Sequence, residues 1–131
     1  MRAIMIQGNE LFDILTGVRK MDYRIWQPQD KQEKKGRILL CSAAKKYKGY
    51  ACGYALATAE IGKIEKYPEE ALDGGDLFGW EWKKIRLIAP VKLKMRSRQT
   101  FFELDDAVAQ EMKGMKLQEW VETFYDPIRS W

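Results

Sequence analysis

Residues 50–59 constrain the fold most strongly, because they alternate strictly between two kinds of side chain. Alanine and glycine fill every second position, and the positions between them hold Tyr50, Cys52, Tyr54, Leu56 and Thr58. A period of two is that of a β-strand, so one face of this strand is large and the other nearly bare. A bare face lets a helix, a facing barrel wall or a ligand approach the backbone closely, and packing is the simpler explanation. We therefore expect a fold built on a sheet.

Further strand patterns lie on both sides of this segment, and they predict strands at residues 2–6, 22–26, 37–43, 80–88 and 91–102. The last of these has one wet, basic face and is typical of a sheet edge. Residues 28–36 and 68–79 are polar or acidic and predict connections.

Two segments have helical patterns instead. Asn9 is a suitable N-cap for a helix that ends at Thr16, with Gly17 following it. Apolar residues at helical spacing, with Asp105 as cap and Pro127 as stop, predict a helical tail. At 131 residues the chain is expected to form one domain. The predicted class is α+β: a small mixed β-barrel of five or six strands with an N-terminal helix at its mouth and a C-terminal helical extension.

Charge is distributed in alternating blocks, although the net charge is only +4. Residues 19–48 carry +7 and residues 83–102 carry another +7, whereas residues 49–82 between them carry −5. One explanation is solubility and surface salt bridges. The other is that the two basic blocks converge into a surface that attracts a polyanion.

The composition excludes several kinds of chemistry. The chain has no histidine, which rules out Ser-His-Asp or Cys-His catalysis and an imidazole base. With only two cysteines, Cys41 and Cys52, we expect neither a structural zinc nor a disulfide framework, and hence no metal and no cofactor. No apolar run reaches the roughly 18 residues of a membrane span, and the early polar residues do not fit a secretory leader. We therefore expect a cytoplasmic protein that does not bind a membrane.

The junction between the first helix and the next strand reads Gly17-Val18-Arg19-Lys20-Met21-Asp22-Tyr23-Arg24. This segment resembles the signature of the ASCH domain family, a branch of the PUA-like fold, whose pattern is Gly-x-Lys-x-x-Glu-x-Arg. Gly17 and Arg24 match the pattern. Arg19 replaces the family's lysine and Asp22 replaces its glutamate, and both replacements keep the charge.

Other features follow in the family's order. They are Trp26, the strand at residues 36–43, the glycine- and alanine-rich strand at residues 51–60, and Trp80-Glu81-Trp82 followed by Pro90. The resemblance covers residues 1–102, so we divide the chain into a barrel at 1–102 and a helical extension at 103–131 that packs on the same domain.

The resemblance implies a cleft between the signature helix and the barrel mouth that binds RNA or modified nucleotides. Some members of the family are enzymes, and these hydrolyse acetylated cytidine or act as ribonucleases. The deacetylating group has a lysine where Arg19 stands and a threonine nucleophile where Asp22 stands, so this chain departs from it at both positions.

The physical chemistry of the signature residues leaves two interpretations open. Asp22 and Arg24 are two apart on a strand and so share a face. They either form an ion pair at the barrel rim or present a guanidinium fork to phosphate or a base edge. Arg19 and Lys20 follow a helix C-terminus and stay cationic, and Arg19 cannot act as a base.

A second group of candidates follows the strand at residues 37–43. Lysines alternate there with tyrosines, a pattern that suits single-stranded nucleic acid as well as a solvated turn. Lys45 is the candidate acid or base, paired with Asp22 or Glu81, and Ser42 is the nearest hydroxyl.

The tryptophans divide into core and candidate stacking residues. Trp120 is expected in the core, from its helical register. Trp80 and Trp82 share a strand face, so both are buried or both exposed. Trp26 lies on the same face as Arg24 and is the candidate platform for stacking a base.

We predict a module that binds RNA or a nucleotide in a basic cleft. Its expected binding residues are Arg19, Lys20, Arg24, Trp26, Lys46, Lys83, Arg86, Lys92, Lys94 and Arg96. The alternatives are a ribonuclease or nucleoside amidohydrolase that uses Lys45 and Asp22, and a module that binds a protein partner through the C-terminal helix.

Overall fold

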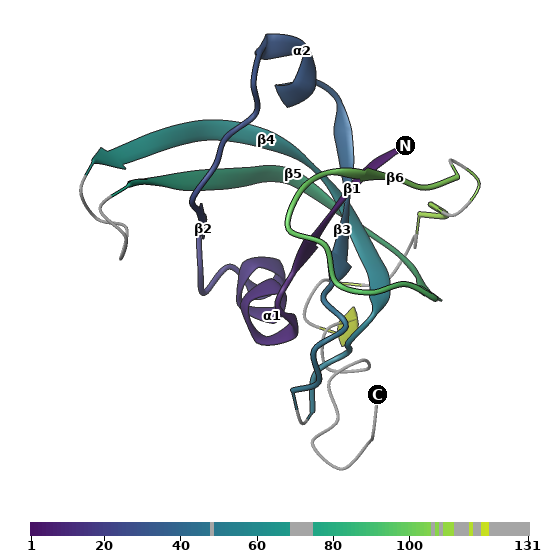
Figure 1. Ribbon diagram of the computed structural model, residues 1–131. Helices are drawn as coiled ribbons and strands as arrows, with labels where there is room; N and C mark the ends of the chain where they lie inside the picture. Colours follow the sequence, from purple (N-terminus) through teal and green to yellow (C-terminus); the bar gives the residue numbers. More distant parts are fainter. Residues whose placement is uncertain are drawn as a thin grey trace.

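The structure, a computed structural model, describes residues 1–47, 49–68, 75–105, 107, 109–111, 116 and 119–120. This part of the chain contains six strands and two helices (Figure 1). In order they are β1 (Arg2–Ile6), α1 (Gly8–Thr16), β2 (Met21–Arg24), α2 (Lys31–Lys34), β3 (Arg37–Ser42), β4 (Tyr54–Pro68), β5 (Asp76–Lys92) and β6 (Phe102–Glu103).

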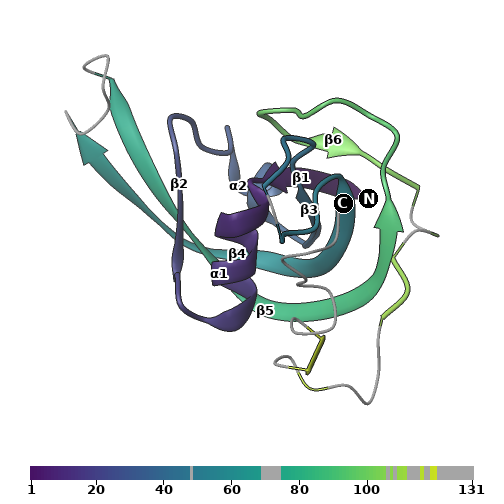
Figure 2. The same ribbon diagram turned by 90° about the horizontal axis from the view of Figure 1, so that it is seen from below.

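All six strands belong to one sheet with the order β2-β5-β4-β3-β1-β6. β1 and β3 are parallel, and every other neighbouring pair is antiparallel. The long strands β4 and β5 curve around β1 and β3 (Figure 2). β2 and β6 are the two edges of the sheet and do not pair with each other, so the expected closed barrel is corrected to an open, curled sheet.

Register shifts explain how β4 and β5 bend. Between the pairs Ile61–Trp82 and Ile64–Trp80, β4 has one extra residue, and between Ala55–Val91 and Ala57–Leu87, β5 has two. Bulges of this kind kink a strand and increase its twist. The second shift contains Pro90, which has no N–H group and is tolerated at a bulge.

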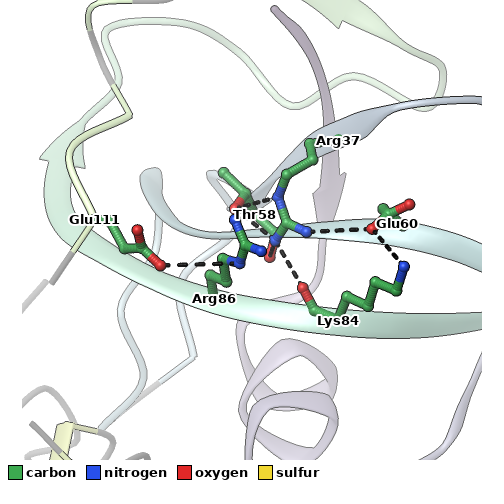
Figure 3. A network of polar contacts seen from close by, with 6 residues as sticks. All are labelled: Arg37, Thr58, Glu60, Lys84, Arg86 and Glu111. Carbon is green, nitrogen blue, oxygen red and sulfur yellow. Dashed lines mark hydrogen bonds and ion pairs between the residues drawn. The ribbon is translucent and has the colours of Figure 1, made fainter. Parts of the chain in front are cut away.

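A third bulge is supported by a polar network across β3, β4 and β5 (Figure 3). Lys84 has a positive φ of 52°, and its carbonyl oxygen accepts a hydrogen bond of 2.7 Å from Arg37. The same guanidinium donates to Thr58 and lies 3.6 Å from the carboxylate of Glu60. Desolvation by burial is the main reason that the pKa of Arg37 is lowered. Arg37 therefore ties the bulged strand to its neighbours.

The hydrophobic core forms on both faces of the central strands. Ile4 and Ile38 belong to one cluster, while Ala3 and Leu39 belong to the other. α1 covers the first cluster with Leu11, Ile14 and Leu15, the three apolar residues that the sequence places on one face of this helix. Strands buried on both sides contain continuous apolar runs, which is why β1 and β3 show no polar alternation.

Several boundaries differ from the sequence-based expectation. The bounds of β1 are those expected from the sequence. Gly17 is the left-handed C-cap of α1, as expected, but the N-cap of this helix is Gln7 rather than Asn9. The expected strands at 80–88 and 91–102 are replaced by one strand, β5, which continues through the bulge at Pro90 and ends at Lys92. The strand expected at 50–59 starts at Tyr54 and extends to Pro68. Residues 31–34 form a short helix within the expected polar loop.

Most of the expected C-terminal helix lies outside the described residues. Of the part that is described, Glu111 forms an isolated bridge with Ile88, and Gln110 accepts a hydrogen bond from the backbone of Ala89. The expected continuous helix from Asp105 is therefore wrong at residues 109–111. These residues are not helical and pair with the edge of β5. Trp120 is 2% exposed and lies in the main core, as its register predicted.

Candidate nucleic-acid interface

The signature residues Asp22 and Arg24 form a buried ion pair. The Arg24 Nε donates to Asp22 Oδ2 at 2.8 Å, and the two side chains are only 11% and 5% exposed. The remaining guanidinium nitrogens donate to the backbone oxygens of Met5 at 2.8 Å and Gln99 at 3.3 Å. Trp82 Nε1 donates to the same Asp22 oxygen at 3.5 Å. The shared face is confirmed, and the geometry favours the ion-pair interpretation.

Arg24 thereby joins the two ends of the curled sheet. It stands on the edge strand β2, whereas Met5 belongs to β1 and Gln99 to the segment before β6. Trp26 reinforces this seam, because its ring contacts that of Phe101 edge-to-face at 5.3 Å. The side chains of Arg24 and Trp26 therefore connect the two ends of the sheet, which are not joined by backbone hydrogen bonds.

The three candidate stacking tryptophans are packed into this region. Trp80 is fully buried and Trp82 is 6% exposed, which confirms that the pair shares one environment and places both in the core. The half-buried Trp26 lies edge-to-face on Trp80 at 4.8 Å, and its carbonyl accepts the Trp80 Nε1 hydrogen bond at 3.2 Å. The Arg24 guanidinium covers both rings at 5.8 and 5.5 Å. The Trp26 ring therefore already contacts Trp80, Phe101 and Arg24.

A first surface hollow, of about 350 Å³, lies where α1 ends and β2 begins, against β5. Three of the expected cations line it, namely Arg19, Lys20 and Lys83. Its floor is apolar, because Ile14, Trp82 and Ile85 also line it, and its other polar wall is the carboxylate of Glu81. We call it the signature hollow.

A second hollow, of about 390 Å³, lies between α2 and the β4–β5 pair. It is lined by Lys31, Lys34 and Lys35 together with Glu60 and the backbone at 61–62. Lys83 lines this hollow too, so it is common to both. We call it the α2 hollow. The geometry brings the first basic block and the start of the second one together at Lys83.

The six cations that line the two hollows have no carboxylate partner in the described part of the chain. Among the residues that the structure describes, none of the six lies within 4 Å of a carboxylate. Several other cations of β3, β4 and β5 are paired, such as Lys66 with Asp76 at 3.3 Å and Arg86 with Glu111 at 3.9 Å, whereas Lys92 at the end of β5 has no ion pair with a described residue. Unneutralised charge lining a concave surface produces the strongest local attraction for an anion.

Glu81 is held in the signature hollow by the bulge in β4. A Cβ atom at Gly62 would collide with the Glu81 carboxylate, so a side chain at this position would displace that carboxylate. The Lys63 backbone N–H donates to Glu81 Oε1 at 3.3 Å. An oriented acceptor among cations can receive a hydrogen bond from a ligand that carries N–H groups.

The second group of candidate residues lies elsewhere. Lys45 and Lys46 are exposed, line neither hollow, and follow the C-terminal end of β3, whereas α2 precedes its N-terminal end. The Lys45 ammonium lies 5.5 Å from the ring of Tyr47. Ser42 is fully buried and bonded to the backbone of Tyr54, so it does not reach solvent. Asp22, the other candidate acid–base group, is buried and paired with Arg24.

The remaining expected cations are also outside the hollows. All are exposed and line neither of the two; they are Arg86, Lys92, Lys94 and Arg96. Conversely, sequence reasoning missed the three lysines of the α2 hollow. The available signal was their density, since three of five residues from 31 to 35 are lysine just before a buried strand.

Two further findings concern metals and membranes. Among the described residues, no three Cys, Asp or Glu side chains are grouped so as to hold a metal ion. In the same part of the chain, no helix is both long and apolar enough to span a bilayer.

Solved structures with a similar fold are known. Crystal structures of two single-residue mutants of an ASCH protein from Zymomonas mobilis match with a TM-score of 0.58 and 13% identity, covering 80% of this chain and 88% and 90% of theirs. The crystal structure titled ASCH from the same organism matches with a TM-score of 0.58 and 10% identity, covering 95% of each chain.

The protein therefore has an ASCH-type fold, as the resemblance of residues 17–24 predicted. No protein-family model matches the sequence, and no curated protein is similar to it. At 10–13% identity the likeness concerns the fold, so the site has to be argued from this chain's own residues.

Proposed function

We propose that this protein binds RNA or a nucleotide through the signature hollow and the α2 hollow. The observation that carries the proposal is the set of six cations, unpaired among the described residues, around two concave surfaces that share Lys83. A chain of phosphates is the ligand whose charge complements such a surface, because each contact releases counterions.

The composition of the signature hollow supports a ligand with more than phosphate groups. Its apolar floor beneath Arg19 and Lys20 suits the flat face of a base or a sugar. The Glu81 carboxylate accepts hydrogen bonds, which phosphate cannot donate but the amino group of a base can. The ASCH-type fold agrees with this assignment. Arg24 and Trp26 contribute by holding the seam together rather than by contacting the ligand.

The proposal is tested by fluorescence anisotropy with a labelled single-stranded RNA over a range of salt concentrations. Single strands lose affinity with a slope of about −0.7 in log–log form for each phosphate contacted, so three or four contacts give a slope of about −2 to −3. Lys83→Ala is expected to weaken binding about fivefold, which corresponds to roughly 1 kcal/mol, and to make the slope shallower by about one contact.

Lys66→Ala is the matched control, since it removes the same charge from an exposed lysine that is paired with Asp76 and lines neither hollow. This variant should bind as the unmodified protein does. Absence of binding at low salt, a flat salt response, or equal losses in the two variants would refute the proposal.

A further inference from the structure

The outer face of β2 carries large side chains that the core does not use. Asp22 and Arg24 point inward to the seam, while Tyr23 between them is 50% exposed and Ile25 beyond them is 68% exposed. Among the described residues, only Val18 joins these two as a large exposed apolar side chain. All three lie within eight residues of the chain, next to the signature hollow.

Tyr23 is paired with a second tyrosine across the sheet. Its ring centroid lies 6.2 Å from that of Tyr67 on β4, with the planes tilted by 54°. Gly79 of β5 lies between the two strands, and a Cβ atom there would stand 2.9 Å from Met21, 3.2 Å from Tyr67 and 3.3 Å from Tyr23. The absence of a side chain at this position lets both rings settle against the backbone of β5. We call Tyr23 and Tyr67 over Gly79 the tyrosine platform.

The platform is held in a fixed geometry. The Tyr67 hydroxyl donates a short hydrogen bond to the Glu65 carboxylate, which orients the ring. Tyr23 stands directly opposite Gly79 in the β2–β5 ladder. Rings fixed before binding lose little conformational freedom when a ligand stacks on them.

The platform also lies on the same face of β5 as the shared lysine. Gly79, Glu81 and Lys83 are alternate residues of a regular stretch, and the Glu81 and Lys83 side chains both flank the bare position at Gly62. At the rise of a strand, Lys83 is about 13 Å from Gly79. A single strand of a few nucleotides can therefore contact the cations with its phosphates while one of its bases reaches the rings.

We propose that the tyrosine platform is a nucleobase-stacking subsite for single-stranded RNA bound by the two hollows; this inference rests on the proposed function. An exposed aromatic ring on the same strand face as a lysine suits single-stranded nucleic acid, because a base stacks on the ring while phosphates pair with lysine. Tyr23 takes the role that the sequence suggested for Trp26, which is packed between Trp80 and Phe101 instead.

The test compares two labelled oligonucleotides of equal length, one of uridines and one of abasic residues with the same phosphate backbone. Tyr23→Ala is expected to weaken binding of the uridine oligonucleotide about tenfold and to leave the abasic one within about twofold. Tyr23→Phe keeps the ring and should retain the affinity. Tyr47→Ala, which removes the aromatic ring next to Lys45, is the control and should change neither affinity.

Each outcome decides something different. If the unmodified protein binds neither oligonucleotide, the proposed function itself fails. If it binds both but Tyr23→Ala has no effect, or weakens both equally, the stacking subsite is refuted while the basic hollows stand. If Tyr47→Ala discriminates between base and abasic strands and Tyr23→Ala does not, stacking occurs at the other lysine-rich stretch. Thermal unfolding of each variant shows whether it is folded.

Discussion

Replacement of Arg24 by methionine should destabilise the protein far more than the loss of an ordinary surface arginine. The substitution removes the donors to Asp22, Met5 and Gln99 at 2.8, 2.8 and 3.3 Å. Among the described residues, the donor that remains to the Asp22 side chain, which is 5% exposed, is Trp82 Nε1 at 3.5 Å. Breaking a buried pair by removing one partner costs about 3–5 kcal/mol, because a charge remains buried without compensation.

That loss is large compared with the total free energy of unfolding, which is about 5–15 kcal/mol for a domain. Urea unfolding, followed by tryptophan fluorescence, measures it directly, since Trp80 and Trp82 lie next to the pair. Arg24→Lys should have an intermediate effect, because one ammonium group cannot reach three acceptors as the planar guanidinium does.

Two controls separate this explanation from a general effect of methionine. Arg86→Met removes an exposed arginine that lies 3.9 Å from Glu111, and it should cost no more than about 1 kcal/mol. The double variant Asp22→Asn, Arg24→Met no longer buries a charge and should recover part of the stability lost in the single variant. If Arg24→Met costs no more than Arg86→Met, the seam does not depend on this ion pair.

Two further predictions concern titrating groups. Burial raises the pKa of the Cys41 thiol to about 12, so in a Cys52→Ser variant the remaining thiol should not react with a disulfide reagent at pH 8 until denaturant is added; rapid labelling of the native protein would contradict this. The hydrogen bond to Glu65 raises the pKa of Tyr67 to about 12. Glu65→Gln should therefore move one phenol toward the ordinary value of about 10 in an absorbance titration, and unchanged curves would show that the hydrogen bond is absent in solution.

The periodicity of the sequence was sufficient to predict which residues close together in the chain share a face or an environment. It placed Asp22 and Arg24 on one face, put Trp80 and Trp82 in one environment, and located the end of α1 at Gly17. These features depend on backbone geometry over a few residues, which the sequence encodes directly. The pattern at residues 17–24 also pointed to the correct fold.

Periodicity does not show which face of a strand is buried, or which residues from other parts of the chain bury it. The sequence could not decide between an ion pair and a ligand fork for Arg24, because the deciding partners, Met5 and Gln99, are 19 and 75 positions away. Separate strands were expected at residues 80–88 and 91–102, and only the bulge in the β4–β5 ladder shows how one strand continues past Pro90.

The sequence by itself determined that the chain forms a sheet, where the main helix lies, and how the basic residues cluster along the chain. Only the tertiary structure decided which cations meet. Lys31, Lys34 and Lys35 join Lys83 because the strand registers place Arg37 opposite Glu60 and Glu60 opposite Lys83, whereas Lys45 follows the far end of β3. The sequence gives the charge of each segment directly. A concave electropositive surface depends instead on distances between residues that are remote in sequence, and the packing of the whole chain sets those distances.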